Sequence, residues 1–364
     1  MTIADPPASP DAQRFAQVDE LRGIAAVLVL VLHAASTFAP NALRHGHGDL
    51  LSRVALGVDF GRIGVVLFFA ISGFVVANSL ASPGMTLRRF AVRRFFRLYP
   101  LFWLSVAAAA ALATPAPPAA AVAANATMVP ALFGFEPLIG LYWTLETELV
   151  FYLAAALAAG AGLLFRPAAL LAAIAALIAL FAALMFGLLP AASRLEWQSM
   201  PLNLAFMLWG ALFHATRFQP PRGTGEVALR EWAPRLGAAL VLAPSLFVLA
   251  RYFHSASPDD LRWGVSYPIA LVLFWSFCAL RRRPSRVLVG LGVVSYSVYL
   301  FHALVVDLLA RVLAAGAIPG AFASLPAMTA LTLAATAAVA AATYLLVEKP
   351  FIAAGRRLSA RGGR

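Results

Sequence analysis

Cysteine and lysine are almost absent from this chain of 364 residues, and charged residues of any kind are scarce. The lone cysteine, Cys278, excludes an internal disulfide and a cysteine-rich metal site. Lys349 is the single lysine, so arginine carries nearly all of the positive charge. Only 12% of the residues are charged and 62% are hydrophobic, which excludes an ordinary large soluble domain.

Motifs of several soluble enzyme classes are missing as well. The sequence has no phosphate-binding P-loop, no dinucleotide-binding glycine pattern and no Gly-x-Ser-x-Gly nucleophile turn. His45 and His47 with Asp49 hint at a metal, but two histidines without further ligands favour a solvated loop. We therefore expect no metal. The net charge of +12 does not predict a nucleic-acid partner, because in a membrane protein the distribution of charge matters more than its total.

Apolar runs of about 20 residues predict an all-α polytopic membrane protein with about ten transmembrane helices. The expected spans are about 23–40, 62–80, 96–113, 141–165, 167–189, 200–215, 233–250, 264–280, 287–311 and 325–347. We expect a disordered cytoplasmic tail at 1–18, a membrane domain at 19–352 and a basic cytoplasmic tail at 353–364. The Pro/Ala-rich segment 114–140 turns apolar at 128–135, which is typical of a re-entrant or interfacial piece.

The distribution of positive charge predicts the orientation. With both termini inside, the inner segments hold all but seven of the 28 lysine and arginine residues. The seven outer ones are Arg44, Arg53, Arg62, Arg194, Arg251, Arg262 and Arg311. This bias matches the positive-inside rule and favours cytoplasmic termini.

The first span carries an arginine and a histidine on one helix face. Arg22 and His33 are eleven residues apart, close to three full turns, so about 16 Å of rise separates them. In a membrane-crossing helix Arg22 lies near one headgroup layer and His33 near the midplane. An ionisable group at that depth is costly, so His33 is either part of a functional site or hydrogen-bonded to a neighbouring helix.

Arginines and aromatic residues alternate from Arg88 to Pro100. Arg93 and Arg94 lie four and three residues before Arg97, so all three point toward one side of a helix at the membrane surface. Guanidinium groups suit phosphates, and the aromatic rings suit an adenine or a lipid interface. The alternative is a topology determinant that binds anionic lipid headgroups.

Polar residues also mark the second and fourth spans. Ser72 and Gly73 allow either close helix packing or close approach of a ligand. In the fourth span, Trp143 and Glu146 lie on one face, and Glu148 lies on the opposite face with Tyr152. Carboxylates inside a span are expensive unless they face a cavity or a cation, so they form either a structural ion pair or part of a site.

The ninth predicted span places Ser295, Tyr299 and His302 on one stripe, with His302 toward the outer leaflet. His302 is then a second acid/base group or a substrate contact, or else a buried histidine with a structural hydrogen bond.

Together these stretches resemble acyltransferase family 3, the membrane-bound sugar O-acetyltransferase family of bacteria. The similar segments occur in the family's order: Val18–Ala26 with His33, Gly64–Phe74, Phe90–Pro100, Trp143–Tyr152, Ser295–His302 and Glu348–Phe351. Two positions depart from the family. Glu20 stands where a glycine or another small residue is usual, and Val66 stands where an acid is frequent.

The resemblance implies a cytoplasmic acyl-CoA donor, most often acetyl-CoA, and an acceptor hydroxyl reached from the outer side of the bacterial inner membrane. We expect the acceptor to be a carbohydrate or glycolipid, surrounded by membrane lipids, and any second acyl-transfer protein outside to be a separate chain. The expected site is His33 with Glu146 and Glu148 for catalysis, Arg22, Arg93, Arg94 and Arg97 for the donor, and Trp143, Tyr299 and His302 for the acceptor.

Other functions fit the same residues. A transporter or flippase can use charges at the midplane as a substrate or proton relay, and a lipid-binding scaffold can use the arginines alone. An acyltransferase of this type can also modify a small molecule such as a macrolide. Within the acyltransferase interpretation, His33 either accepts a proton or carries the acyl group itself.

Overall fold

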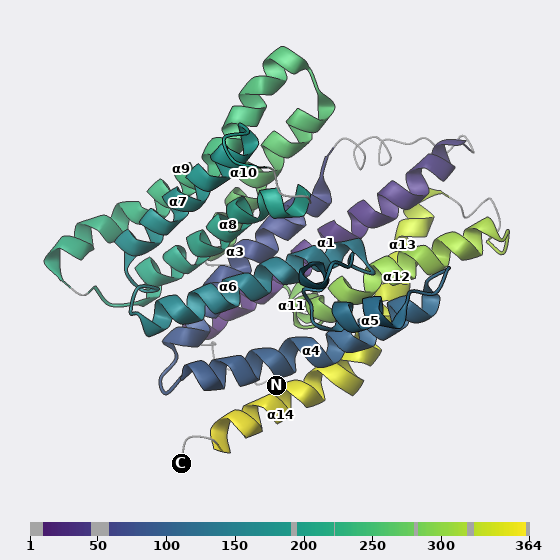
Figure 1. The fold of residues 1–364 in the computed structure, drawn as a ribbon, viewed down its shortest axis with the longest axis horizontal. Helices are drawn as coiled ribbons and strands as arrows, with labels where there is room; N and C mark the ends of the chain where they lie inside the picture. Colours follow the sequence, from purple (N-terminus) through teal and green to yellow (C-terminus); the bar gives the residue numbers. More distant parts are fainter. Residues whose placement is uncertain are drawn as a thin grey trace, which may run out of the picture.

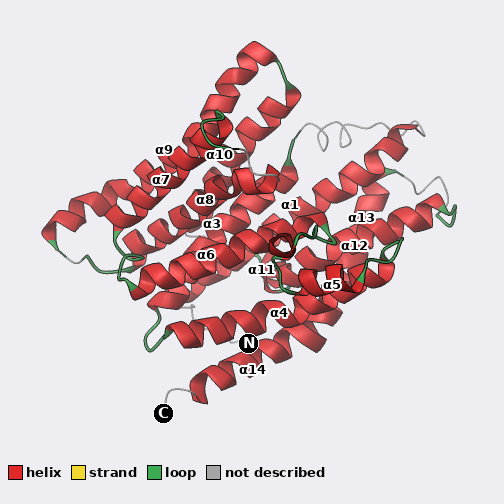
Figure 2. Cartoon of the chain, in the orientation of Figure 1, coloured by secondary structure: helices red, strands yellow, loops and turns green. Residues whose placement is uncertain are grey.

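The computed structural model describes residues 10–44, 58–190, 195–221, 223–279, 283–318 and 324–361. All regular secondary structure in these ranges is helical, which confirms the all-α prediction (Figure 2). The long helices are α1 (Pro10–Arg44), α3 (Phe60–Ala81), α4 (Leu87–Leu112), α6 (Trp143–Gly160), α7 (Pro167–Met185), α8 (Leu195–Phe218), α9 (Thr224–Ser255), α10 (Pro258–Ala279), α12 (Ser295–Ala314) and α13 (Leu325–Thr343). The shorter ones are α5 (Ala119–Ala126), η1 (Pro130–Phe133), η2 (Gly140–Tyr142), α11 (Arg286–Val293), the π-helical η4 (Tyr344–Glu348) and α14 (Lys349–Arg361).

Eight helices in the described residues are long and apolar enough to cross a membrane. They match eight of the expected spans. The spans expected at 141–165 and 200–215 correspond to α6 and α8, which are outside that set. Both helices carry polar side chains, such as Glu148 in α6 and His214 in α8. The total of ten spans stays a prediction.

Three segments have helix boundaries that the sequence did not predict. Within the tail expected at 1–18, residues 10–18 are the first turns of α1, where Gln17 and Val18 are buried, and residues 1–9 lie outside the described ranges. Residues 353–361 continue the helix α14, which packs along α4 through a stacked Phe96–Phe351 pair. The ninth expected span divides into α11 and α12 on either side of Val294.

Helix α3 lies between α1 and α8 and has extensive contacts with both (Figure 1). Helices α7 and α9 pack on α8, and α10 packs on α9 and α3, whereas α11, α12 and α13 pack on α1. Helix α4 runs along the edge of this bundle with α14 beside it (Figure 1). Side chains from α1, α3, α4, α6 and α12 can therefore meet between the two groups of helices.

Glycines on the facing sides of α3 and α8 allow these two helices to approach each other closely. A methyl group added to Gly73 in α3 would lie 1.8 Å from the Met207 carbonyl oxygen of α8. One added to Gly210 in α8 would lie 2.0 Å from the Ala70 carbonyl oxygen of α3. The two backbones are therefore in direct contact, which supports the packing interpretation of Gly73.

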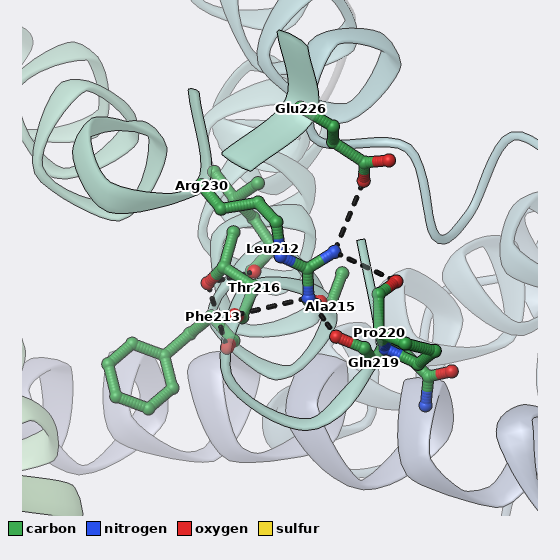
Figure 3. Close-up of polar contacts among 8 residues, drawn as sticks. All are labelled: Leu212, Phe213, Ala215, Thr216, Gln219, Pro220, Glu226 and Arg230. Carbon is green, nitrogen blue, oxygen red and sulfur yellow. Dashed lines mark hydrogen bonds and ion pairs between the residues drawn. The ribbon is translucent and has the colours of Figure 1, made fainter. Parts of the chain in front are cut away.

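The C-terminal end of α8 is closed by one arginine of α9 (Figure 3). The Arg230 guanidinium donates to the carbonyl oxygens of Ala215, Thr216, Gln219 and Pro220, and to the Glu226 carboxylate. The last carbonyls of a helix have no partner inside the helix, so this fork satisfies groups that would otherwise need water. It also fixes the turn between α8 and α9.

The segment 114–140 folds as α5, η1 and η2 against α4. The Tyr99 hydroxyl and the Trp103 indole of α4 donate to the carbonyls of Thr127 and Ala126, at 3.2 and 2.9 Å. The Asn125 side chain binds the backbone of Glu136 and Leu138, which closes the loop on itself. These contacts bring the chain back to the start of α6.

Candidate active site

A cavity of about 100 Å³ lies between α1, α3, α4, α6 and α12. Polar and charged side chains from all five helices line it, among apolar neighbours. They are Arg22, Ser72, Arg94, Arg97, Thr144, Glu148, Tyr152, Ser295, Tyr296 and Tyr299. Three of the four arginines expected to bind the donor therefore share one cavity with one of the two expected carboxylates.

Arg94 is held over two aromatic rings, and that of Tyr152 belongs to the cavity wall. Its guanidinium carbon is 5.2 Å from the centre of the Phe90 ring and 4.9 Å from the centre of the Tyr152 ring. One of its nitrogens donates to the Tyr152 hydroxyl at 3.3 Å. The Tyr152 hydroxyl in turn donates to the Glu148 carboxylate. The Arg94 guanidinium is therefore stacked on aromatic faces and connected to a carboxylate by hydrogen bonds. These contacts fix its orientation before any ligand binds.

Glu148 receives a second hydrogen bond from α3. The Ser72 hydroxyl donates to the same carboxylate oxygen at 2.8 Å. Ser72 thus faces the cavity while its neighbour Gly73 packs against α8, and close approach of a ligand at Ser72 stays a prediction.

Arg22 and Arg97 lie near enough to repel each other, and three carboxylates offset that repulsion. The first is Asp19, which forms an ion pair with Arg22 at 3.6 Å. Glu148 and Glu348 both attract Arg22, and Glu348 also attracts Arg97. Glu348 is 2% exposed and accepts a hydrogen bond from Ser297 at 2.8 Å. It ends the π-helical turn η4, a conformation that occurs frequently at functional sites.

Sequence reasoning did not place Glu348 in the site. The residue was noticed only as part of a C-terminal motif. A carboxylate directly after a long apolar run was the available signal, because such a group needs a cation when it is buried.

Arg93, the fourth expected arginine, does not line the cavity. Its Nε donates to the Ser359 hydroxyl of α14 at 3.0 Å. Arg93 and Arg94 are neighbours on a helix, so their side chains point about 100° apart. Arg93 therefore faces α14 and Arg94 faces the cavity.

His33 and His302 lie side by side. Their ring centres are 4.9 Å apart and the rings are nearly perpendicular, at 73°. Sequence reasoning put both histidines in the site without pairing them. Neither lines the cavity of the arginines, but the cavity residue Tyr299 is close to His302, with ring centres 5.9 Å apart.

Backbone carbonyls determine the tautomer of both histidines. The Nδ1 of His33 is 2.9 Å from the Val29 carbonyl oxygen, and the Nδ1 of His302 is 2.7 Å from that of Tyr299. A carbonyl oxygen only accepts, so each Nδ1 carries the hydrogen. Each neutral ring therefore presents a basic Nε2, as a general base requires.

The other carboxylate, Glu146, faces away from the cavity, as the helical spacing predicted. It is 3% exposed, and one of its oxygens accepts a hydrogen bond from the Trp197 indole of α8 at 3.3 Å. Trp143, on the same side of α6, contacts the Phe69 ring at 6.0 Å between centres. The structure therefore separates Glu146 and Trp143 from Glu148, Arg94 and their neighbours.

Glu20, the unusual acid before Arg22, has a structural contact. It is fully buried, and its carboxylate accepts a hydrogen bond from the Ser285 backbone N–H at 3.2 Å. Ser285 is the residue before α11, so the carboxylate stabilises the start of that helix.

The residues considered for a metal lie outside the described ranges: His45, His47 and Asp49. Within the described part of the chain, no group of three or more His, Cys, Asp or Glu side chains is placed to hold a metal ion.

Comparison with known proteins gives one family and one short similarity. The family model described as an acyltransferase domain, that of acyltransferase family 3, matches residues 15–345. The chain is 33% identical over 106 residues to a Rhizobium radiobacter protein described as "Protein 2 in picA locus". That similarity covers 27% of this chain and 45% of the relative, so the chain spans less than half of that protein's length. No solved structure matches the chain.

Proposed function

This chain belongs to the acyltransferase family whose model it matches, and we propose that it moves an acyl group from acyl-CoA to a carbohydrate or glycolipid hydroxyl. Acetyl-CoA is the simplest donor. The family model and the eight apolar helices indicate a multi-pass membrane acyltransferase. The donor, the acceptor and the direction of transfer are the parts that we propose.

The observation that carries the proposal is the arginine cavity. Arg22, Arg94 and Arg97 present three guanidinium groups to one space, and aromatic rings stand beside them. Guanidinium forks bind phosphate oxygens with two parallel hydrogen bonds, and flat rings stack on an adenine. Acyl-CoA carries both groups at one end and the thioester at the other.

The separation between the cavity and His33 suits that donor. Along α1, Arg22 and His33 are about 16 Å apart. A donor whose phosphates rest on the arginines can extend its thin pantetheine arm past Tyr299 toward the histidines. The acyl carbon then arrives beside the basic Nε2 of His33.

The transfer needs only groups that are present. The Nε2 of His33 takes the proton of the acceptor hydroxyl while the hydroxyl oxygen forms a bond to the acyl carbon. The carbon–sulfur bond then breaks, and the leaving thiolate takes the proton back from His33. The products are the ester and free CoA.

Charge distribution supports the direction of transfer. Arg94 and Arg97 belong to a predicted inner segment, and the opposite ends of α1 and α12 are predicted to face outward. This arrangement gives the donor access from the cytoplasm and the acceptor access from the outer side of a bacterial inner membrane, with both termini cytoplasmic. Trp143 and Glu146, at the outer start of α6, belong to the acceptor side.

The test uses three arginines of one helix. Arg94→Gln and Arg97→Gln each remove a guanidinium from the cavity, whereas Arg93→Gln removes one that contacts α14. We expect acetyl-CoA binding by the purified, detergent-solubilised protein to weaken on the order of 10-fold or more in the first two and to change less than about twofold in the third. His33→Ala should retain donor binding and lose acyl transfer.

Two results would overturn the proposal. Equal losses in all three arginine variants would mean that the arginines act as a general basic surface for lipid headgroups. Absence of acetyl-CoA binding in the wild-type protein would favour a transporter or flippase, which has no need of a CoA site.

A further inference from the structure

We propose that His302 is a positioning residue that shares one proton with His33 during acyl transfer. The inference rests on the proposed function, because it concerns the same reaction. It assigns to His302 a role behind His33, in place of a direct contact with the acceptor.

The burial of the two rings separates their roles. His302 is 1% exposed, whereas His33 is partly exposed. An incoming hydroxyl therefore meets His33 first. The ring centres are 4.9 Å apart, so the edge of one ring lies against the other.

The Nε2 of His302 is buried and has no hydrogen-bond partner among the described residues. Its Nδ1 is already bound to the Tyr299 and Val298 carbonyl oxygens, at 2.7 and 3.2 Å. A buried acceptor without a donor costs free energy, so its presence calls for a donor that arrives during the reaction. His33, whose ring centre is 4.9 Å away, can become that donor once its own Nε2 is protonated.

His33 needs such a partner when it acts as the base. Its Nδ1–H already donates to Val29 at 2.9 Å, so a proton gained on Nε2 turns the ring into a cation. An unpaired cation in the membrane interior is costly. A hydrogen bond from the new Nε2–H of His33 to the Nε2 of His302 spreads that charge over two rings.

The proton balance closes within the pair. The acceptor O–H proton moves to the Nε2 of His33 as the oxygen attacks the acyl carbon. That hydrogen then binds the Nε2 of His302 while the carbon–sulfur bond breaks. The departing thiolate takes the proton, and both rings return to their neutral state. No other proton donor or acceptor is required.

Two substitutions at one position separate this role from a structural one. In His302→Asn, the amide N–H₂ can still donate to the backbone carbonyls, as Nδ1 does, but the acceptor at the Nε2 position is lost. In His302→Gln, the longer amide can place its oxygen where Nε2 was and accept the hydrogen of His33. We therefore expect His302→Asn to reduce kcat roughly 10- to 100-fold with an unchanged KM for acetyl-CoA, and His302→Gln to recover most of that loss.

The double variant tests the coupling. If His302 acts through His33, His302→Asn should have no further effect on the residual activity of His33→Ala. Thermal unfolding of each detergent-solubilised variant shows whether it is folded.

The outcomes distinguish the inference from the proposed function. Loss of acyl transfer in His33→Ala together with equal losses in His302→Asn and His302→Gln would reject proton sharing and leave the proposed function intact. A raised KM for acetyl-CoA with an unchanged kcat in His302→Asn would also reject it. Full activity of His33→Ala would reject proton sharing and the role of His33 as the base, and would leave acyl transfer itself to be carried out by other groups.

Discussion

The Ser72 hydroxyl donates to the Glu148 carboxylate at 2.8 Å and so joins α3 to α6 in the wall of the arginine cavity. The same carboxylate oxygen accepts from Tyr152, and Tyr152 accepts from Arg94. A continuous chain of hydrogen bonds therefore runs from α3 through α6 to the guanidinium on α4. Glu148 positions the arginine and also provides part of the charge that balances it.

Removal of the Tyr152 hydroxyl tests this chain of hydrogen bonds. In Tyr152→Phe the ring that supports Arg94 remains, but the hydroxyl between Arg94 and Glu148 is lost. We expect KM for acetyl-CoA to rise roughly fivefold while kcat changes little, because one hydrogen bond of donor positioning is worth about 1 kcal/mol. Steady-state kinetics with varied donor concentration measures both constants.

A second tyrosine of the same region provides the control. The Tyr99 hydroxyl donates to the Thr127 carbonyl at 3.2 Å, outside the cavity. Tyr99→Phe should therefore leave KM for the donor unchanged. A lower kcat with a normal KM in Tyr152→Phe would contradict the positioning role and place that hydroxyl in the chemical step.

Close packing of α3 on α8 makes a prediction for stability. Gly73→Ala would bring a methyl group within 1.8 Å of the Met207 carbonyl oxygen, so the two helices must separate. We expect a loss of stability on the order of 1–3 kcal/mol, seen as a lower thermal unfolding temperature in detergent. Gly290→Ala is the matched control, since nothing lies within 4 Å of its added methyl group. Similar unfolding temperatures for the two variants would contradict the direct backbone contact.

Helical periodicity predicted the directions of side chains within single helices. It put Arg22 and His33 on one face of α1, and Glu146 and Glu148 on opposite faces of α6. Each is a relationship within one helix, where 3.6 residues per turn determines direction without any knowledge of neighbours. The all-α class followed from the apolar runs in the same way.

Relationships between helices could not be predicted from the sequence. Arg93 and Arg94 are identical side chains at adjacent positions, so the sequence alone does not distinguish them. Only the position of α14 determines that Arg93 binds Ser359. The His33–His302 pair joins residues far apart in the chain, and no spacing rule connects them. The burial of Gln17 and Val18 could not be predicted either, because it depends on contacts that form only in the folded bundle.

The last prediction concerns Glu348. Its negative charge, and not its hydrogen bond, balances the positive charge of the arginines. Glu348→Gln keeps the volume and an acceptor for Ser297 but removes the carboxylate that attracts Arg22 and Arg97. The empty cavity then holds an uncompensated cation, and we expect a loss of stability on the order of 1–3 kcal/mol.

The anionic phosphates of acetyl-CoA should replace the missing charge. Saturating acetyl-CoA should therefore raise the unfolding temperature more in Glu348→Gln than in the wild type, since a ligand stabilises the folded state that it completes. Asp307→Asn is the control: its partner Arg311 is 2.8 Å away, and both side chains are 48% exposed. That surface pair contributes little and should show no donor dependence. An equal stability loss in Glu348→Gln with and without acetyl-CoA would mean that Glu348 only holds η4 against Ser297, and that the cavity arginines do not need its charge.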